Sequence, residues 1–398
     1  MLSRARLGTF LTFAVAGLMS GVWVVRMPAL KERFALDAGG VGVVLLVWGI
    51  AAVLTMQGLR GVIARVGSRA SLRVAAPLTA VSLALVAFAP SHPLLLAGVA
   101  LFGMAFGVTD VAMNAQASVV ERAHGRPLMS GMHAGWCVGA MSGGLLGSGT
   151  AALGWSFTSS VLAAALVSLP LTLMLGRAYL PDPQALPEAS EGRRRRLPLL
   201  VYLLGALTFL AFMTEGAIAD WSGLFLHDDL GASEALAALG YPLFEAAMLC
   251  GRIFGDRLRV LLGTRVLLAA SGAGTAAGMA VVLLAPGLPV ALAGFFLTGL
   301  AVCTIVPTML SLAGTAAPGR SSAAVAQVGA MGYGGLLLGP VVVSAVAEAS
   351  SIRAGLWLVV ALSAVIAVSA RFLPLRRSAD LAAAPLPERR AEHEPLAA

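Results

Sequence analysis

Charged side chains are scarce in this chain. Asp, Glu, Lys and Arg together make up 12% of its 398 residues, whereas soluble globular proteins average about 25%. Hydrophobic residues make up 59% and the mean hydropathy is +0.89. A chain of this composition has too few charges to cover a water-exposed surface. The composition therefore excludes an ordinary soluble globular protein.

Cysteine and catalytic motifs are also sparse. The three cysteines, Cys137, Cys250 and Cys303, lie in apolar segments and form no CxxC pair, so we expect buried thiols and neither a disulfide nor a metal site. The sequence contains no HExxH motif, no nucleophile–base constellation and no phosphate-binding glycine loop between a strand and a helix. We therefore expect no enzymatic activity, no cofactor and no ATP-driven pump.

Long apolar runs are abundant. They recur along the chain at lengths of 18 or more residues, and such a run in a helix crosses a hydrocarbon core about 30 Å thick. A spanning backbone must satisfy its own hydrogen bonds, which permits helices or a closed barrel. Because the runs are continuous rather than alternating, they predict helices. The first run, after Arg4 and Arg6, is interpreted as a span rather than a cleaved signal peptide.

The apolar runs predict twelve spans, and positive charge predicts their orientation. With both termini in the cytoplasm, 23 of the 27 Lys and Arg residues fall on the cytoplasmic side. The positive-inside rule therefore favours an inner-membrane protein with this topology. The net charge of +8 is explained by topology, so we expect lipid and no nucleic acid as a partner. The predicted spans are 7–30, 39–59, 70–89, 93–119, 128–151, 154–176, 198–226, 234–256, 264–285, 288–314, 320–346 and 352–373.

The spans divide into two similar halves. We predict an N-terminal half over 1–178, a cytoplasmic linker over 179–197, a C-terminal half over 198–373 and a disordered tail over 374–398. Aligning the segment after span four with the segment after span ten places His133 on Gln327. Parallel six-span repeats of this kind are typical of one large class of secondary transporters.

Two groups of motifs carry a resemblance to a known family. The segment Arg252-Ile-Phe-Gly255-Asp256-Arg257 resembles the signature loop of the major facilitator superfamily. The first copy, around Arg65, has Ala64 where that family usually has Asp. The resemblance implies that Arg65, Gly255, Asp256 and Arg257 belong to gating loops.

More narrowly, DVAMNAQ (110–116) and EGAIADWSG (215–223) are similar to the YbjJ and MosC branch near the fucose permeases. The resemblance implies an all-α membrane protein with twelve transmembrane helices in two pseudo-symmetric halves. In that fold, spans one, four, seven and ten line a central cavity and spans three, six, nine and twelve face lipid.

Ionisable side chains inside the predicted spans are the candidates for function. A charge at bilayer depth costs about 2.5–3.5 kcal/mol by insertion scales, so each one needs a reason. Glu215, Glu245 and Asp110 are the candidates for proton coupling, because a carboxylate in a low-dielectric site retains a proton more readily than in water. A structural hydrogen bond between helices is the alternative for each. Arg26 is expected to reach the membrane interface at the outer end of span one.

A second set of polar and aromatic residues is expected to bind the solute. His133 is also interpretable as a packing residue or as a proton relay, and Trp23 and Trp221 as part of an interfacial aromatic belt. Glu215 and Asp220 are roughly 140° apart around a helix, so we do not expect them to share one site. The candidates are Asn114, His133, Gln327, Trp23, Trp136, Asp220, Trp221, Thr304 and Tyr333.

Together these observations predict a secondary active transporter that works by alternating access. We expect a monomer that couples protons to the movement of a small polar solute such as a sugar, polyol or inositol derivative. A proton-driven exporter of a small metabolite or drug is the alternative. The resembled drug exporters carry a Gly-Pro pair on span five, whereas Leu145 follows Gly143 and Gly144 here, which argues against drug export.

Overall fold

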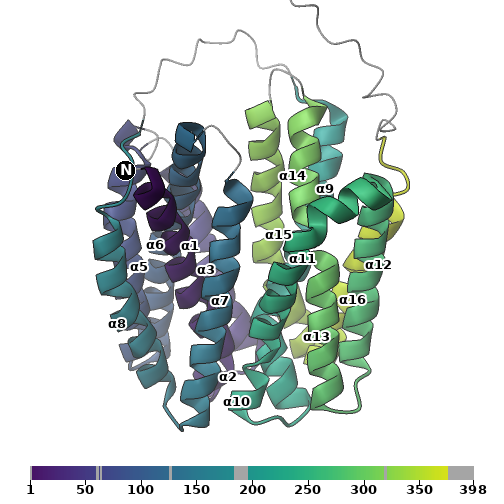
Figure 1. The fold of residues 1–398 in the computed structure, drawn as a ribbon. Helices are drawn as coiled ribbons and strands as arrows, with labels where there is room; N and C mark the ends of the chain where they lie inside the picture. The colour runs from purple at the N-terminus through teal and green to yellow at the C-terminus, as the bar shows by residue number, and fades with distance from the viewer. Residues whose placement is uncertain are drawn as a thin grey trace, which may run out of the picture.

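The computed structural model describes residues 2–59, 62, 65–124, 128–182, 196–317 and 321–374. The described residues form two helical bundles, one from each half of the chain, which stand side by side (Figure 1). The N-terminal bundle contains α1 (Leu2–Val25), α2 (Met27–Arg33), α3 (Ala38–Gly58), α5 (Ser68–Phe88), α6 (His92–His124), α7 (Met129–Ala152) and α8 (Phe157–Leu175).

The C-terminal bundle repeats this arrangement with more interruptions. It contains α9 (Leu199–Leu224), the π-helix η1 (Phe225–Asp229), α10 (Glu234–Ala237), α11 (Gly240–Leu262), α12 (Thr264–Leu283), α13 (Leu288–Val302), α14 (Ile305–Ala316), α15 (Ser321–Ala349) and α16 (Ile352–Ser369). α13 and α14 together form the predicted tenth span. The break at Cys303 and Thr304 lies just before Pro307, whose ring excludes the carbonyl of the residue four positions earlier from a regular helix.

The helices agree with the predicted membrane protein. Eleven helical segments of the described chain are long and apolar enough to cross a bilayer. α7, with 24 residues, occupies the position of the predicted fifth span, and its many glycines and serines lower its hydropathy. An all-α membrane fold of two six-helix halves is therefore confirmed.

One helix pair in each half is held together by glycine. In the N-terminal half, a Cβ added to Gly139 of α7 would collide with the backbone of Ala14 on α1. In the C-terminal half, a Cβ on Gly335 of α15 would collide with the backbone of Phe209 on α9. Small residues allow membrane helices to approach this closely. The two pairs, α1–α7 and α9–α15, occupy equivalent places in the repeat.

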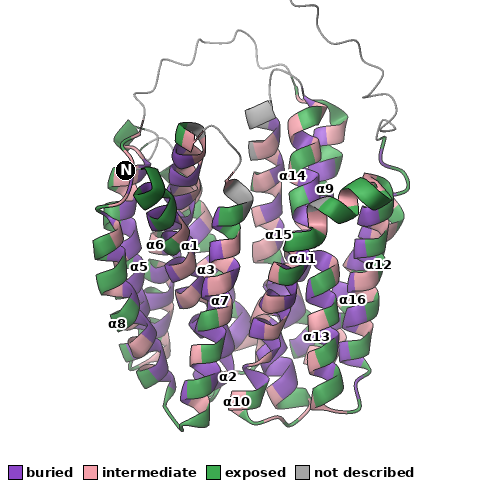
Figure 2. Ribbon diagram, in the orientation of Figure 1, coloured by how far each residue is buried: buried purple, intermediate pink, exposed green. Residues whose placement is uncertain are grey.

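The outward faces of the bundles carry exposed apolar side chains. Figure 2 shows exposed residues on the outer helices and buried residues between them. Leu166 and Met174 of α8 are exposed, as are Val365 and Val368 of α16. On a soluble protein such surfaces would be a liability, but in a bilayer they are what lipid contacts.

Ion pairs join the two halves at one end of the molecule. We call this set the latch: Arg26, Lys31 and Glu32 of the N-terminal half with His227, Asp228 and Glu234 of the C-terminal half. Arg26 Nη1 lies 2.7 Å from Glu234 Oε1, and its Nη2 donates to the Trp155 carbonyl at 2.7 Å. Arg26 is 1% exposed, so the expectation that it reaches the interface is wrong. Its charge is instead paired between the halves.

The start of the linker is fastened to the N-terminal half. Tyr179 is buried and its hydroxyl lies 2.8 Å from that of Thr12. Asp182 accepts hydrogen bonds from Ser68 Oγ at 2.7 Å and from the Arg69 backbone N–H at 3.1 Å. Burial alone would raise the pKa of Asp182, but these hydrogen bonds outweigh it and lower the pKa. Most of the predicted linker, 183–195, and nearly all of the tail, 375–398, lie outside the described residues.

The second signature motif is helical rather than a loop. α11 continues through Gly255 and Arg257 to Leu262, and the connection to α12 is the single residue Gly263, with φ at +75°. That left-handed conformation favours glycine. Arg257 is exposed, and the side chain of Asp256 lies outside what the structure describes. In the first copy Arg65 is exposed, beside residues 60–61 and 63–64, which also lie outside the described residues.

Candidate functional site

A cavity of about 210 Å³ lies between the two halves. It is lined by α1, α3, α6 and α7 on one side and by α9, α11 and α15 on the other. The sequence-predicted residues that line it are Trp23, Asp110, His133, Trp136, Glu215, Asp220, Glu245 and Tyr333.

The N-terminal wall of the cavity is aromatic. On α6, Phe102, Phe106, Asp110 and Met113 all line the cavity, and their spacing of three or four residues keeps them on one helix face. The rings of Phe102 and Phe106 lie 6.0 Å apart in an edge-to-face arrangement. This face therefore presents apolar rings along much of its length and a single carboxylate.

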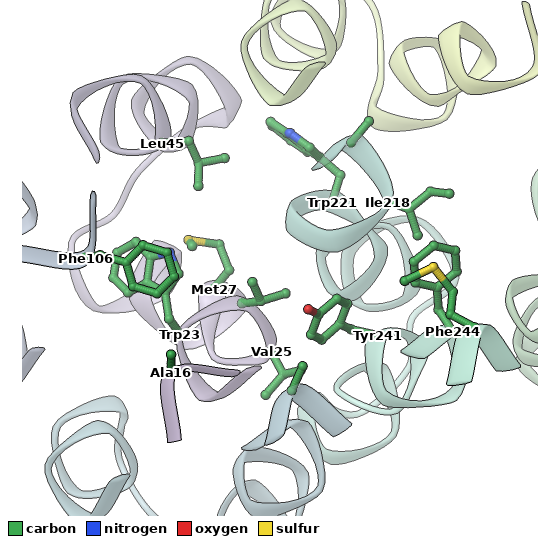
Figure 3. Close-up of a cluster of buried hydrophobic side chains, with 14 of the residues drawn as sticks. Ala16, Trp23, Val25, Met27, Leu45, Phe106, Ile218, Trp221, Tyr241 and Phe244 are labelled. Carbon is green, nitrogen blue, oxygen red and sulfur yellow. The ribbon is translucent and has the colours of Figure 1, made fainter. Parts of the chain in front are cut away.

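Three tryptophans extend this aromatic wall. Trp23 packs edge-on against Phe102 at 5.8 Å, Trp136 against Phe106 at 5.9 Å, and Trp48 lies 5.4 Å from Phe106. Figure 3 shows Trp23 and Phe106 on one side of the interface and Tyr241 of the other half facing them. The indole N–H of Trp48 is buried without a hydrogen-bond partner among the described residues. The N-terminal wall is thus aromatic and contains one buried donor that has no partner in the described protein.

The C-terminal wall carries most of the charge. On α9, Glu215, Gly216, Ala219 and Asp220 all line the cavity. The two carboxylates stand at the edges of an arc of roughly 140°, with the two small residues between them. The prediction that they serve different sites is therefore wrong for this structure, because the cavity contacts a much wider face of α9 than a single stripe.

α11 supplies a second stripe and an unexpected cation. Tyr241, Glu245, Met248 and Arg252 all line the cavity, and intervals of four, three and four residues place them on one face. Glu245 is 3% exposed, and its Oε2 has no hydrogen-bond partner in the described part of the chain. Its environment includes Tyr241 and, from the other half, Cys137.

Arg252 is the charged cavity residue that the sequence prediction missed. The sequence places it in the cytoplasmic signature motif, but it lines the cavity and its guanidinium interacts electrostatically with Glu215 and Glu245. Nη1 lies 2.9 Å from Cys137 Sγ and Nη2 4.0 Å from Met248 Sδ. Sulfur is a weak acceptor, and Nε has no partner among the described groups. Arg252 follows Glu245 by seven residues, an interval that places both on one helix face and could have predicted that Arg252 lines the cavity.

Asp110 and Tyr333 join the two walls. The Tyr333 hydroxyl donates to Asp110 Oδ2 at 2.6 Å, which links α6 to α15 across the interface. Asn114 Nδ2 donates to the Asp110 backbone carbonyl at 2.9 Å and lies 3.4 Å from Oδ1. Asp110 is therefore a hydrogen-bonded carboxylate between the halves, and Asn114 supports it from the next helical turn.

His133 faces the cavity from α7 and packs against α1. Its ring lies 5.2 Å from that of Phe13, in an edge-to-face arrangement, and it belongs to the cavity lining. The structure thus combines the packing and the cavity-lining interpretations of this residue.

Four predicted solute-binding residues lie away from the cavity. Trp221 is fully buried and donates to the Pro340 carbonyl at 3.1 Å, which holds α9 against α15. The Thr304 hydroxyl lies 2.7 Å from that of Ser271 on α12, so this hydrogen bond connects the break in span ten to α12. Asn114 and Gln327 are not among the cavity-lining residues of the described chain. Helical periodicity predicts which side of a helix each of these residues occupies, but it does not predict whether the side chain reaches the cavity.

Comparison with known proteins agrees with this architecture. The family model of the Major Facilitator Superfamily matches residues 9–259 and 204–397. The chain is 33% identical over 365 residues to the transporter y4wD of Sinorhizobium fredii, covering 91% of this chain and 96% of that one. It is 31% identical over 376 residues to the membrane protein MosC of Rhizobium meliloti, covering 92% and 89%.

Solved structures share the fold at low sequence identity. The nucleoside transporter NupG matches with a TM-score of 0.71 at 15% identity, covering 94% of this chain and 100% of that one. A bacterial homolog of the human lysosomal transporter Spinster matches with a TM-score of 0.74 at 13% identity, covering 94% and 96%. The two halves, the cavity between them and these matches agree, and the chain belongs to the Major Facilitator Superfamily of membrane transporters.

Proposed function

We propose that this protein is a proton-coupled secondary transporter that moves a sugar, polyol or inositol derivative by alternating access. The observation that carries the proposal is the cavity between the halves, in which the half-buried Glu215 and the buried Glu245 lie in the field of Arg252. An intramembrane ionisable residue beside a cavity is a functional candidate by default, since its desolvation is costly.

The coupling follows from competition for Arg252. When Glu215 or Glu245 loses its proton, the new carboxylate is attracted to the guanidinium, which is otherwise held by sulfur atoms. When the carboxylate is protonated, Arg252 is free for the solute's hydroxyl groups. Proton and solute occupancy are then linked through one cation.

We propose that the protein sits in the inner membrane with both termini in the cytoplasm. The latch then closes the outer end, and alternating access requires its ion pairs to separate. Breaking Arg26–Glu234 and the contacts around Asp228 would open the cavity outward while the glycine-packed pairs α1–α7 and α9–α15 move as parts of their own halves.

Solute flux in proteoliposomes under an imposed pH gradient tests the proposal. We expect uptake that collapses with a protonophore and falls at least tenfold in Glu215→Gln or Glu245→Gln. Asp37→Asn is the matched control, because Asp37 caps α3 through the Gly40 N–H and Asn caps a helix as well. Flux that is unchanged in the Glu215, Glu245 and Asp110→Asn variants would exclude proton coupling by these groups. Flux driven only outward would instead support the exporter.

A further inference from the structure

We propose that the solute carries a basic amine, and that Asp220 is its counter-ion. This inference rests on the proposed function and concerns the charge of what the cavity accepts. The lining contains four carboxylates, Asp110, Glu215, Asp220 and Glu245, and one guanidinium, Arg252. Even when one carboxylate carries the coupling proton, acidic groups outnumber basic ones.

Three of the four carboxylates have a hydrogen-bond donor or a cationic neighbour within the protein. Asp110 accepts from Tyr333, while Glu215 and Glu245 lie in the field of Arg252. Asp220 has neither a cationic neighbour nor a hydrogen-bond donor among the described residues. It is partly exposed, and the space it is exposed to is the cavity. When Asp220 is ionised, its charge therefore needs a partner that enters from the cavity.

The groups around Asp220 suit an ammonium ion. Asp220 lies four residues before the end of α9 and Trp23 two residues before the end of α1, so both are near the latch end of the cavity. Tyr241 is also in the environment of Asp220. Trp23 and Trp48 line the cavity, and the face of an aromatic ring attracts a cation by about 0.5–2 kcal/mol. Glu245 lines the same cavity and adds a second acidic side chain beside an ammonium group.

A neutral polyol would leave the negative charge of Asp220 at this end of the cavity without a positive partner. Hydroxyl groups can donate to carboxylates, but they do not balance a buried negative charge, which is costly unless it is paired. An aminated ring would place its hydroxyls near Arg252 and its ammonium group near Asp220. The arrangement therefore favours an amine-bearing polar solute over its neutral counterpart.

Binding of matched solute pairs to the purified full chain tests the proposal. Glucosamine against glucose and benzylamine against benzyl alcohol each differ chiefly by one ammonium group, and Kd is measured by quenching of tryptophan fluorescence at pH 7. We expect the amine of at least one pair to bind on the order of tenfold more tightly, as charge pairing in a desolvated site implies. We expect Asp220→Asn to remove this preference, Asp220→Glu to restore it and Asp37→Asn to leave it unchanged.

Three outcomes would overturn the proposal. They are equal affinities within both pairs, no binding by either amine, and a preference that survives in folded Asp220→Asn, whose folding is checked by its thermal unfolding midpoint. Each leaves the proton-gradient experiment intact, because that experiment asks whether pH-driven flux is lost in Glu215→Gln and Glu245→Gln, whichever solute is carried. Loss of that flux response with a retained amine preference would instead remove the proposed coupling and leave the binding site.

Discussion

The two halves of the molecule share one scaffold but present different walls to the cavity. The N-terminal wall combines three tryptophans and two phenylalanines with a single carboxylate, Asp110. The C-terminal wall combines three carboxylates with Arg252. The glycine-packed helix pairs beneath both walls are equivalent. The two halves therefore share their helix packing and differ in their lining, which carries one carboxylate on the N-terminal side and most of the charge on the C-terminal side.

Removing Arg252 is the largest test of this division. We expect Arg252→Gln to lower proton-driven flux by roughly a hundredfold or more, because Glu215 and Glu245 lose the cation that they share, and to destabilise the fold, since an uncompensated buried charge costs about 3–5 kcal/mol. Arg252→Lys retains the charge and should retain part of the flux. Thermal unfolding of the double variant Glu245→Gln/Arg252→Gln separates folding from coupling: the midpoint should recover and the flux should not. Normal flux in Arg252→Gln would remove the C-terminal wall from the coupling.

The fold was predictable from the sequence because its signals are long and repeated. Apolar runs, the bias of positive charge and the repeat of the two halves each extend over the whole chain, and their agreement fixed the class. The interruption near Pro307 was also foreseeable, since proline removes a helical hydrogen bond.

The site was only partly predictable because its geometry depends on depth and on contacts between the halves. The cost of burying charge identified Glu215, Glu245 and Asp110, but it gave no reason to combine Glu215 with Asp220. Arg252 was assigned to a cytoplasmic motif, although it shares a helix face with Glu245. Trp221 is a residue type that often contacts polar solutes, yet its indole N–H donates to a backbone carbonyl on α15.

The glycine-packed pairs α1–α7 and α9–α15 are equivalent, so an added methyl group should destabilise the protein by a similar amount at either pair. We expect Gly139→Ala and Gly335→Ala each to destabilise the protein by about 1–3 kcal/mol, because both force a backbone contact apart. Gly149→Ala is the control. Gly149 lies on the same helix as Gly139, and a Cβ added there meets nothing within 4 Å. Thermal unfolding in detergent measures all three. A neutral result at only one of the two seams would contradict their equivalence.

The aromatic wall should set affinity without changing coupling. Trp48→Phe keeps a ring and removes the unpartnered indole N–H, so we expect Kd for a bound solute to rise about three- to tenfold, which corresponds to one hydrogen bond of about 0.5–1.5 kcal/mol. The ratio of protons to solute should stay the same. Flux and pH change recorded together in proteoliposomes check both quantities, and a changed ratio would place coupling on the aromatic wall as well.

The smallest expected effect concerns the fastening of the linker to the N-terminal half. Asp182 holds the start of α5 through Ser68 and Arg69, and its pKa is lowered in the folded protein. A group with a depressed folded pKa stabilises the fold above its unfolded pKa, and this contribution is lost as pH falls through the folded value. We therefore expect amide exchange at Arg69, corrected for intrinsic rate, to be slow at pH 7 and to rise only below about pH 4. In Asp182→Asn, faster exchange at pH 7 should be confined to the first turn of α5, with the first turn of α12, which begins at Thr264, as the internal reference. Equal acceleration in both turns would mean that the substitution acts on the whole bundle rather than on this contact.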